Sequence, residues 1–358
     1  MSQQPPPGWV PPGHPGHAGP PPASPPPGAP GYGSAPSWGA PVHKPGVVAL
    51  RPLTLGDFYD GAFKTIRSNP GAMVGLSAAV LTVFMVIPVL LTLLVAAFGG
   101  LSTNAFTGSG VDPQVSSALG SGVATLASVL GSVFGFFATA VLNGLLVRVV
   151  AEAVLGRRTS AGQAWRSTRG RLWPLVGLTL LSALVSLVLL GLPVAVAVVV
   201  GFRLGVASAF VVGVPLFVLG VAALVFVQVR WFQLAAPALV LERTGILASV
   251  RRAGMLSRGQ FWRLFGIQLL TFLVVGVVSQ VIAVPLGLLG ASGPFLFPGT
   301  AGALVLVFSS YLSQVVVGAI TTPFTSAVVA LQYVDQRIRK EGLDVSLIAA
   351  SQRPAGPS

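Results

Sequence analysis

The sequence contains no cysteine. A chain without thiols has no disulfide framework, no thiolate nucleophile and no cysteine metal site. Histidine is almost as scarce, because its three copies, His14, His17 and His43, all lie in the first 46 residues. The first two have a spacing that metal sites use, but a flexible tail supplies neither preformed geometry nor a further ligand. We therefore expect no metal and no other cofactor.

Charged residues are also scarce. Only 8% of the residues are charged and 53% are hydrophobic, with a mean hydropathy of +0.83. No charged side chain occurs from Leu264 to Val334, and further charge-free runs cover 68–111, 113–147, 172–202 and 204–229. About 20 apolar residues suffice to cross the roughly 30 Å hydrocarbon core of a bilayer, and the runs lack the strict alternation of barrel strands. They predict an all-α integral membrane domain over 50–345, with spans near 71–98, 123–149, 173–200, 205–230, 264–289 and 302–333.

The basic residues indicate an orientation. With those six spans, twenty of the 21 Lys and Arg fall on one side of the membrane, and only Arg203 falls on the other. The positive-inside rule then places both termini in the cytoplasm, at a bacterial plasma membrane. The chain has a net charge of +13, and its basic residues border the spans. This arrangement favours anionic lipid headgroups as partners, with an attraction of about 1 kcal/mol per basic residue near the surface. No separate basic module with interleaved aromatics occurs, so nucleic acid is not an expected partner.

The amino-terminal segment has its own composition. Residues 1–46 contain 16 Pro and 9 Gly, which predicts a disordered cytoplasmic tail that cannot bury enough surface to fold. It has no apolar stretch typical of a signal peptide, so we expect the first span to act as an uncleaved insertion signal. Two interpretations of the tail stay open: a plain tether, or a docking site for a protein partner. Residues 346–358 are expected to form a short flexible tail.

A motif recurs three times at long range. An arginine followed by Ser or Gly precedes an apolar-apolar-Gly triplet that begins six residues later, at Arg67 with Met73–Gly75, Arg169 with Leu175–Gly177, and Arg258 with Leu264–Gly266. A short amphipathic segment comes before each arginine, and Thr54 with Asp57, and Ser160 with Gln163, have capping-box spacing. We predict three parallel repeats, each an interfacial amphipathic helix lying apolar face down in the headgroups, followed by a transmembrane hairpin.

Five arginines are candidate contacts for anions or lipid headgroups. Arg67, Arg169 and Arg258 belong to the repeated motif, where snorkelling to phosphate is the structural alternative. Arg148 and Arg230 lie at the ends of predicted spans and either face a central cleft or serve structure, Arg148 through an ion pair with Glu152 one turn away. Within the spans, five amides can line a polar path or join neighbouring helices: Asn143, Gln228, Gln268, Gln280 and Gln314.

Groups for ordinary catalysis are missing from the spans. They contain no histidine, no cysteine and no paired carboxylate, and no Gly-Lys-Ser/Thr phosphate loop occurs. We therefore expect that this protein is not an enzyme. A cavity that placed Glu152 or Asp335 beside another titratable group would argue otherwise.

Three segments carry a resemblance to a known family. RPLTLGDFYDGAF (51–63), RWFQLAAPALVLE (230–242) and YVDQRIRKEGLD (333–344) resemble bacterial proteins classed with the glycerophosphoryl diester phosphodiesterase membrane domain, over about residues 50–345. In some members that domain is joined to a phosphodiesterase barrel. Only fourteen residues follow Asp344, whereas such a barrel needs roughly 250, so the resemblance implies the membrane fold and not the catalytic activity.

Two functions are compatible with this sequence. The first is a non-enzymatic accessory or scaffold protein of the bacterial envelope, which recruits partners through its tail. The second is a permease or lipid-handling protein, whose parallel repeats enclose a cleft on the repeat axis.

Overall fold

The computed structural model describes residues 46–48, 51–106, 113–297 and 300–342. All regular structure in these ranges is helical. In chain order the elements are α1 (Leu55–Ser68), η1 (Gly71–Gly75), α2 (Leu76–Phe106), α3 (Pro113–Val154), α4 (Ala161–Thr168), η2 (Arg169–Arg171), α5 (Leu172–Leu204), α6 (Val206–Val227), η3 (Gln228–Phe232), α7 (Ala235–Leu241), α8 (Ile246–Leu256), α9 (Phe261–Leu296) and α10 (Thr300–Glu341). Of the predicted tails at 1–46 and 346–358, all residues except Gly46 lie outside the described residues.

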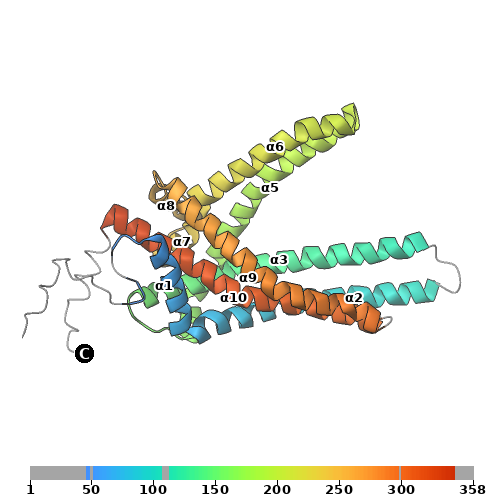
Figure 1. The fold of residues 1–358 in the computed structure, drawn as a ribbon, viewed down its shortest axis with the longest axis horizontal. Helices are drawn as coiled ribbons and strands as arrows, with labels where there is room; N and C mark the ends of the chain where they lie inside the picture. Colours follow the sequence, from blue (N-terminus) through green and yellow to red (C-terminus); the bar gives the residue numbers. More distant parts are fainter. Residues whose placement is uncertain (1–45, 49–50, 107–112, 298–299, 343–358) are drawn as a thin grey trace, which may run out of the picture. The chain divides into compact units, whose positions relative to one another are not determined.

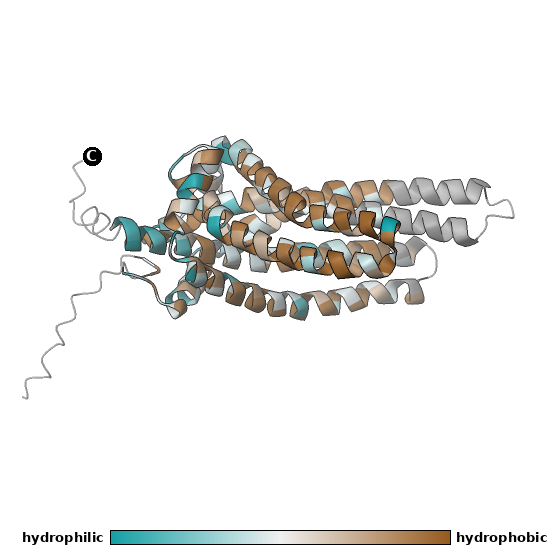
Figure 2. Cartoon of the chain, turned by 90° about the horizontal axis from the view of Figure 1, so that it is seen from above, coloured by the Kyte–Doolittle hydropathy of each residue, from teal (hydrophilic) through white to brown (hydrophobic). Residues whose placement is uncertain are grey.

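Six helical stretches of the described chain are long and apolar enough to cross a membrane. They run over Gly71–Leu94, Val129–Val154, Ala161–Leu204, Val206–Leu241, Phe261–Gly293 and Leu304–Glu341. Large apolar side chains on α5, α6 and α9 are exposed along their length, far beyond the apolar patches of a soluble monomer, and Figure 2 shows hydrophilic residues gathering toward one end. The length and hydropathy of these helices confirm the predicted helical membrane class and the six spans. These features fit a multi-pass membrane protein.

The long helices pack as sequential pairs. α2 contacts α3, α5 contacts α6 and α9 contacts α10, while α10 also packs against α2 and α3 (Figure 1). A short helix precedes each pair: α1, α4 and α8. The turn between α5 and α6 is the single residue Gly205, whose φ of +93° and ψ of 165° lie in a region that only glycine adopts readily. The connection that follows Arg203 and Leu204 is therefore a tight turn.

The short helices begin as their sequences predict. Thr54 Oγ1 accepts a hydrogen bond from Asp57 N, and the Asp57 carboxylate accepts one from Thr54 N. Ser160 and Gln163 form the same reciprocal box at α4. Both predicted capping boxes are confirmed, and each satisfies two backbone donors that the first helical turn leaves without a partner.

The apolar faces of the short helices pack largely against protein. Phe58 and Ala62 of α1, Ala164 of α4 and Ala253 of α8 are fully or almost fully buried. The α1 and α4 residues join the core made by α2, α3 and α10, and Ala253 joins a second core made by the start of α5, α7 and the start of α9. The expectation that these faces lie on the headgroups is wrong for the buried residues, because the ends of the long helices cover them.

Candidate functional site

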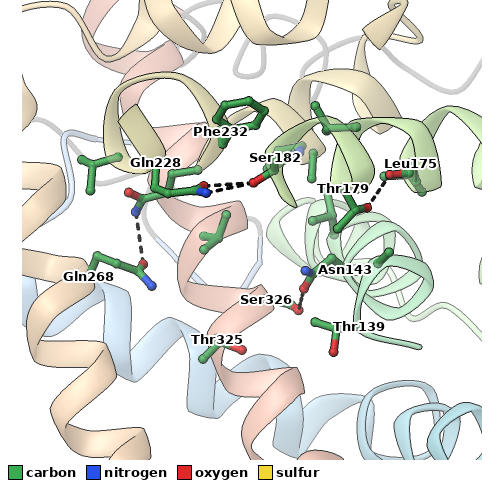
Figure 3. Close-up of a pocket in the computed structure, with 18 residues that line it drawn as sticks. Thr139, Asn143, Leu175, Thr179, Ser182, Gln228, Phe232, Gln268, Thr325 and Ser326 are labelled. Atoms are coloured by element: carbon green, nitrogen blue, oxygen red, sulfur yellow. Dashed lines mark hydrogen bonds between the residues drawn. The ribbon is translucent and has the colours of Figure 1, made fainter. Parts of the chain in front are cut away.

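A cavity of about 360 Å³ lies among α3, α5, α9, α10 and the η3–α7 segment. Figure 3 shows its labelled polar side chains pointing toward one another from these elements. Nine of the 18 lining residues carry hydroxyl or amide groups and none is charged: Thr139, Asn143, Thr179, Ser182, Gln228, Gln233, Gln268, Thr325 and Ser326. The volume falls in the range of small-molecule sites. The bundle therefore holds a pocket of that size with a polar but uncharged lining.

Glycine allows α3 and α5 to meet beside this cavity. A Cβ on Gly144 would lie 2.1 Å from Leu175 Cδ1, which no real side-chain pair tolerates. The close approach brings Asn143 of α3 and Thr179 of α5 to one wall. A larger residue at Gly144 would require the Leu175 side chain to shift.

Gln228 connects α5 with the end of α6. Its Nε2 donates to Ser182 Oγ at 2.9 Å and to Ser186 Oγ at 3.0 Å, and Ser182 Oγ lies 3.2 Å from Gln228 Oε1. Gln228 begins the π-helical turn η3, which continues to Phe232. Such turns interrupt a regular helix and occur frequently at functional sites. Here the wider turn places Gln228 and Gln233 on the same cavity.

One buried polar atom of the cavity has hydrogen-bonding capacity left over. Ser326 Oγ donates to Asn143 Oδ1 at 2.8 Å. Gln233 Nε2 donates to Gln268 Oε1 at 3.1 Å and to Gln332 Oε1, while Gln233 Oε1 is buried and has no partner in the part of the chain that the structure describes. Buried polar atoms normally have partners. Water or the polar part of a ligand can supply the one that this atom lacks.

The polar path expected from five amides is present in part. Asn143, Gln228 and Gln268 line the cavity, whereas Gln280 and Gln314 are exposed and lie outside it. The sequence analysis did not single out Gln233, Ser182, Thr325 or Ser326. Their signal was available, because hydroxyl and amide groups are few in these apolar helices, but helical periodicity alone does not show which faces meet.

Arg148 and Arg230 do not line this cavity. Arg148 is 3.0 Å from Glu152, as the ion-pair alternative predicts. Arg230 Nη1 donates to Gly254 O and, at 2.7 Å, to Ser257 Oγ, so it closes the carboxyl end of α8. The expected placement of this pair on a central cleft is therefore not found, because each guanidinium is engaged at the basic end of the bundle.

The three motif arginines lie exposed at the turns that precede long helices. Arg67 also lines a hollow near the carboxyl ends of α1 and α3, together with Lys64, Arg157 and Arg158. The side chains of Arg169 and Arg258 line none of the cavities found in the described residues. Contact of these arginines with lipid headgroups stays a prediction.

A buried carboxylate ties the start of the domain to its end. Asp335 is fully buried, and its Oδ1 accepts hydrogen bonds from Leu53 N at 2.8 Å and Arg339 Nε at 3.0 Å, while Oδ2 accepts from Arg263 Nη1. The two arginines also donate to Leu53 O. Neither Asp335 nor Glu152 lines the polar cavity.

Glu242 is the centre of a second charged cluster, beside α8 and the end of α10. Arg252 lies 2.9 Å from its carboxylate, Tyr333 donates to Oε1, and Arg337 is 3.8 Å away. Burial acts to raise the pKa of the Glu242 carboxyl, but the hydrogen bonds and positive charges outweigh burial and lower that pKa below its ordinary value. The same carboxylate raises the pKa of Arg252. The cluster is a structural network that stays ionised at neutral pH.

Neither a family model, nor a curated protein, nor a solved structure gives a significant match to this chain. The site must therefore be interpreted from its own geometry.

Proposed function

We propose that this chain is a non-enzymatic, multi-pass protein of a bacterial plasma membrane, which takes a ligand from the bilayer into the cavity among its long helices. This makes it a lipid-handling protein or a permease. The single observation that carries the proposal is the uncharged polar cavity at Asn143, Gln228 and Gln268. Polar groups are costly inside a membrane unless they meet partners or serve a function, and Gln233 Oε1 of this cavity has no partner among the described residues.

The proposed orientation has both termini in the cytoplasm. The basic turns before α2, α5 and α9 would face anionic headgroups, since Arg67, Arg169 and Arg258 are exposed there. Trp173 and Trp262, near the starts of α5 and α9, have 85% and 79% of their surface exposed, which suits the aromatic belt at a membrane interface. The three short-helix and hairpin units support the proposed threefold parallel repeat.

Two further hypotheses rest on the sequence. The scaffold role depends on the tail at 1–45, which lies outside the described residues, and no contact of the described helices favours it over ligand binding. Kinship with the glycerophosphoryl diester phosphodiesterase membrane domain is proposed on the three sequence segments alone. The absence of an enzymatic activity is also a proposal. It is supported by the pairing of Asp335, Glu152 and Glu242 with arginines.

Filling the cavity tests ligand binding directly. Ala236 lines the cavity, and Ala236→Phe adds a ring there without removing a polar group. Ala248 of α8 is exposed and lines no described cavity, so Ala248→Phe is the matched control. The three proteins are extracted from bacterial membranes in mild detergent, and native mass spectrometry measures the small molecules that remain bound.

We expect wild type and the control to carry a bound membrane molecule, and Ala236→Phe to carry at least tenfold less of it. All three should elute as the same monodisperse species. Equal bound mass on all three, or none on any of them, contradicts the proposed function.

A further inference from the structure

An apolar groove adjoins the polar cavity. A second hollow, of about 660 Å³, is lined by Phe136 of α3, by α5 residues from Ser182 to Val194, and by Phe217 of α6. It shares Ser182 and Gln228 with the polar cavity. The two spaces therefore meet at the Gln228–Ser182 hydrogen bonds, with amides and hydroxyls on one side and hydrocarbon on the other.

The groove has the length of a lipid chain. Ser182 to Val194 spans twelve residues of α5, or about 18 Å of helix. Half of the roughly 30 Å hydrocarbon core is about 15 Å. Leu187 and Leu190 line this stretch, and Leu187 has 68% of its surface exposed. An acyl chain lying there would cover apolar surface that the protein leaves open.

The residues that line the polar cavity favour a lipid with an uncharged headgroup. Gln268 and Ser182 lie about 8 and 16 Å along their helices from Arg263 and Arg171. Gln228 is only two residues from Arg230, but the guanidinium of Arg230 donates to Gly254 O and Ser257 Oγ and does not line the cavity. A charged group at such depth is costly without a partner, and no lining residue of the polar cavity is charged. The open capacity of this cavity is the buried amide acceptor Gln233 Oε1, which matches the donor of a hydroxyl group.

We infer that the cavity and groove together bind a lipid with an uncharged, hydroxyl-bearing head, of the diacylglycerol class. The inference rests on the proposed function and names the kind of molecule that the site takes. The head lies among Asn143, Gln233 and Gln268, and one acyl chain runs along α5 past Leu187. Gln228 and Ser182 mark the boundary between the two parts.

Two lipids with the same glycerol backbone and different charge test this assignment. Full-length protein is delipidated in detergent and mixed with dioleoylglycerol or dioleoylphosphatidylglycerol, and native mass spectrometry gives the occupancy of each lipid. Leu187→Trp fills the groove and leaves the polar cavity intact. Leu184→Trp is the matched control, because Leu184 is 57% exposed on the same helix and lines no described cavity.

We expect at least tenfold higher occupancy by dioleoylglycerol than by the anionic lipid, and at least a tenfold loss of dioleoylglycerol in Leu187→Trp but not in Leu184→Trp. Equal or stronger binding of the anionic lipid overturns the inference, as does equal binding by the two tryptophan variants. If either of these results is obtained while Ala236→Phe still loses its natively bound molecule, the inference about the lipid is wrong and the proposed function stands. If Ala236→Phe loses nothing, the proposed function fails as well.

Discussion

Asp335→Ala is expected to lower the free energy of unfolding by about 3 kcal/mol, because removing one partner of a buried ion pair leaves charge without compensation. The substitution leaves Arg263 and Arg339 facing each other without the carboxylate that separates them. It also removes the acceptor for Leu53 N, which Asp335 reaches across 282 residues of sequence. The segment that leads into α1 would then lose its attachment to α9 and α10.

Thermal unfolding in detergent measures this effect. Asp60→Ala is the control, because Asp60 and Lys64 form an exposed pair with side chains 57% and 46% exposed, and such pairs contribute about 0–1 kcal/mol. Asp335→Asn keeps one acceptor oxygen for Leu53 N and should fall between wild type and Asp335→Ala. If Asp335→Ala and Asp60→Ala unfold at the same temperature, the buried carboxylate does not hold the two ends of the domain together.

Gly220→Leu is expected to separate α5 from α6. A Cβ at Gly220 would lie 2.5 Å from Leu189 O and 3.1 Å from Pro193 Cγ. Pro193 has no N–H to donate to Leu189 O, its usual helical acceptor, so this carbonyl is open. The Gly220 backbone lies against that carbonyl, so a Cβ there would meet it. A larger residue must push the helices apart, with an expected loss of about 3 kcal/mol, at the upper end of the usual range for overpacking.

Gly276→Leu is the matched control. Gly276 lies within α9, and a Cβ there meets nothing within 4 Å, so a side chain should be neutral or slightly stabilising through helix propensity. Thermal unfolding of both variants in the same detergent makes the comparison. Equal midpoints for Gly220→Leu and Gly276→Leu would show that α5 and α6 do not depend on the close contact at Gly220.

Local and global features of this chain differed in how well they could be predicted. Hydropathy predicted six spans, and residue spacing predicted the boxes at Thr54 and Ser160, because both depend on neighbours in sequence. Pairings across the fold could not be derived in this way. Helical periodicity gives a face and not its neighbour, so the contacts of Asp335 with Leu53 and of Arg230 with α8 were not foreseen. For the same reason the sequence could not separate Gln268, which lines the cavity, from Gln280, which is exposed.

The orientation of the helices across the membrane is the claim on which the rest depends, and cysteine labelling tests it most directly. The native chain contains no cysteine, so single substitutions can be labelled without background. Val206 at the α5–α6 turn is 72% exposed, and Trp165 of α4 and Leu247 of α8 are 44% and 75% exposed. We predict that a membrane-impermeant maleimide labels Val206→Cys in intact cells, and labels Trp165→Cys and Leu247→Cys only after the membrane is permeabilised. Labelling of Trp165→Cys or Leu247→Cys in intact cells as fast as Val206→Cys would contradict the account.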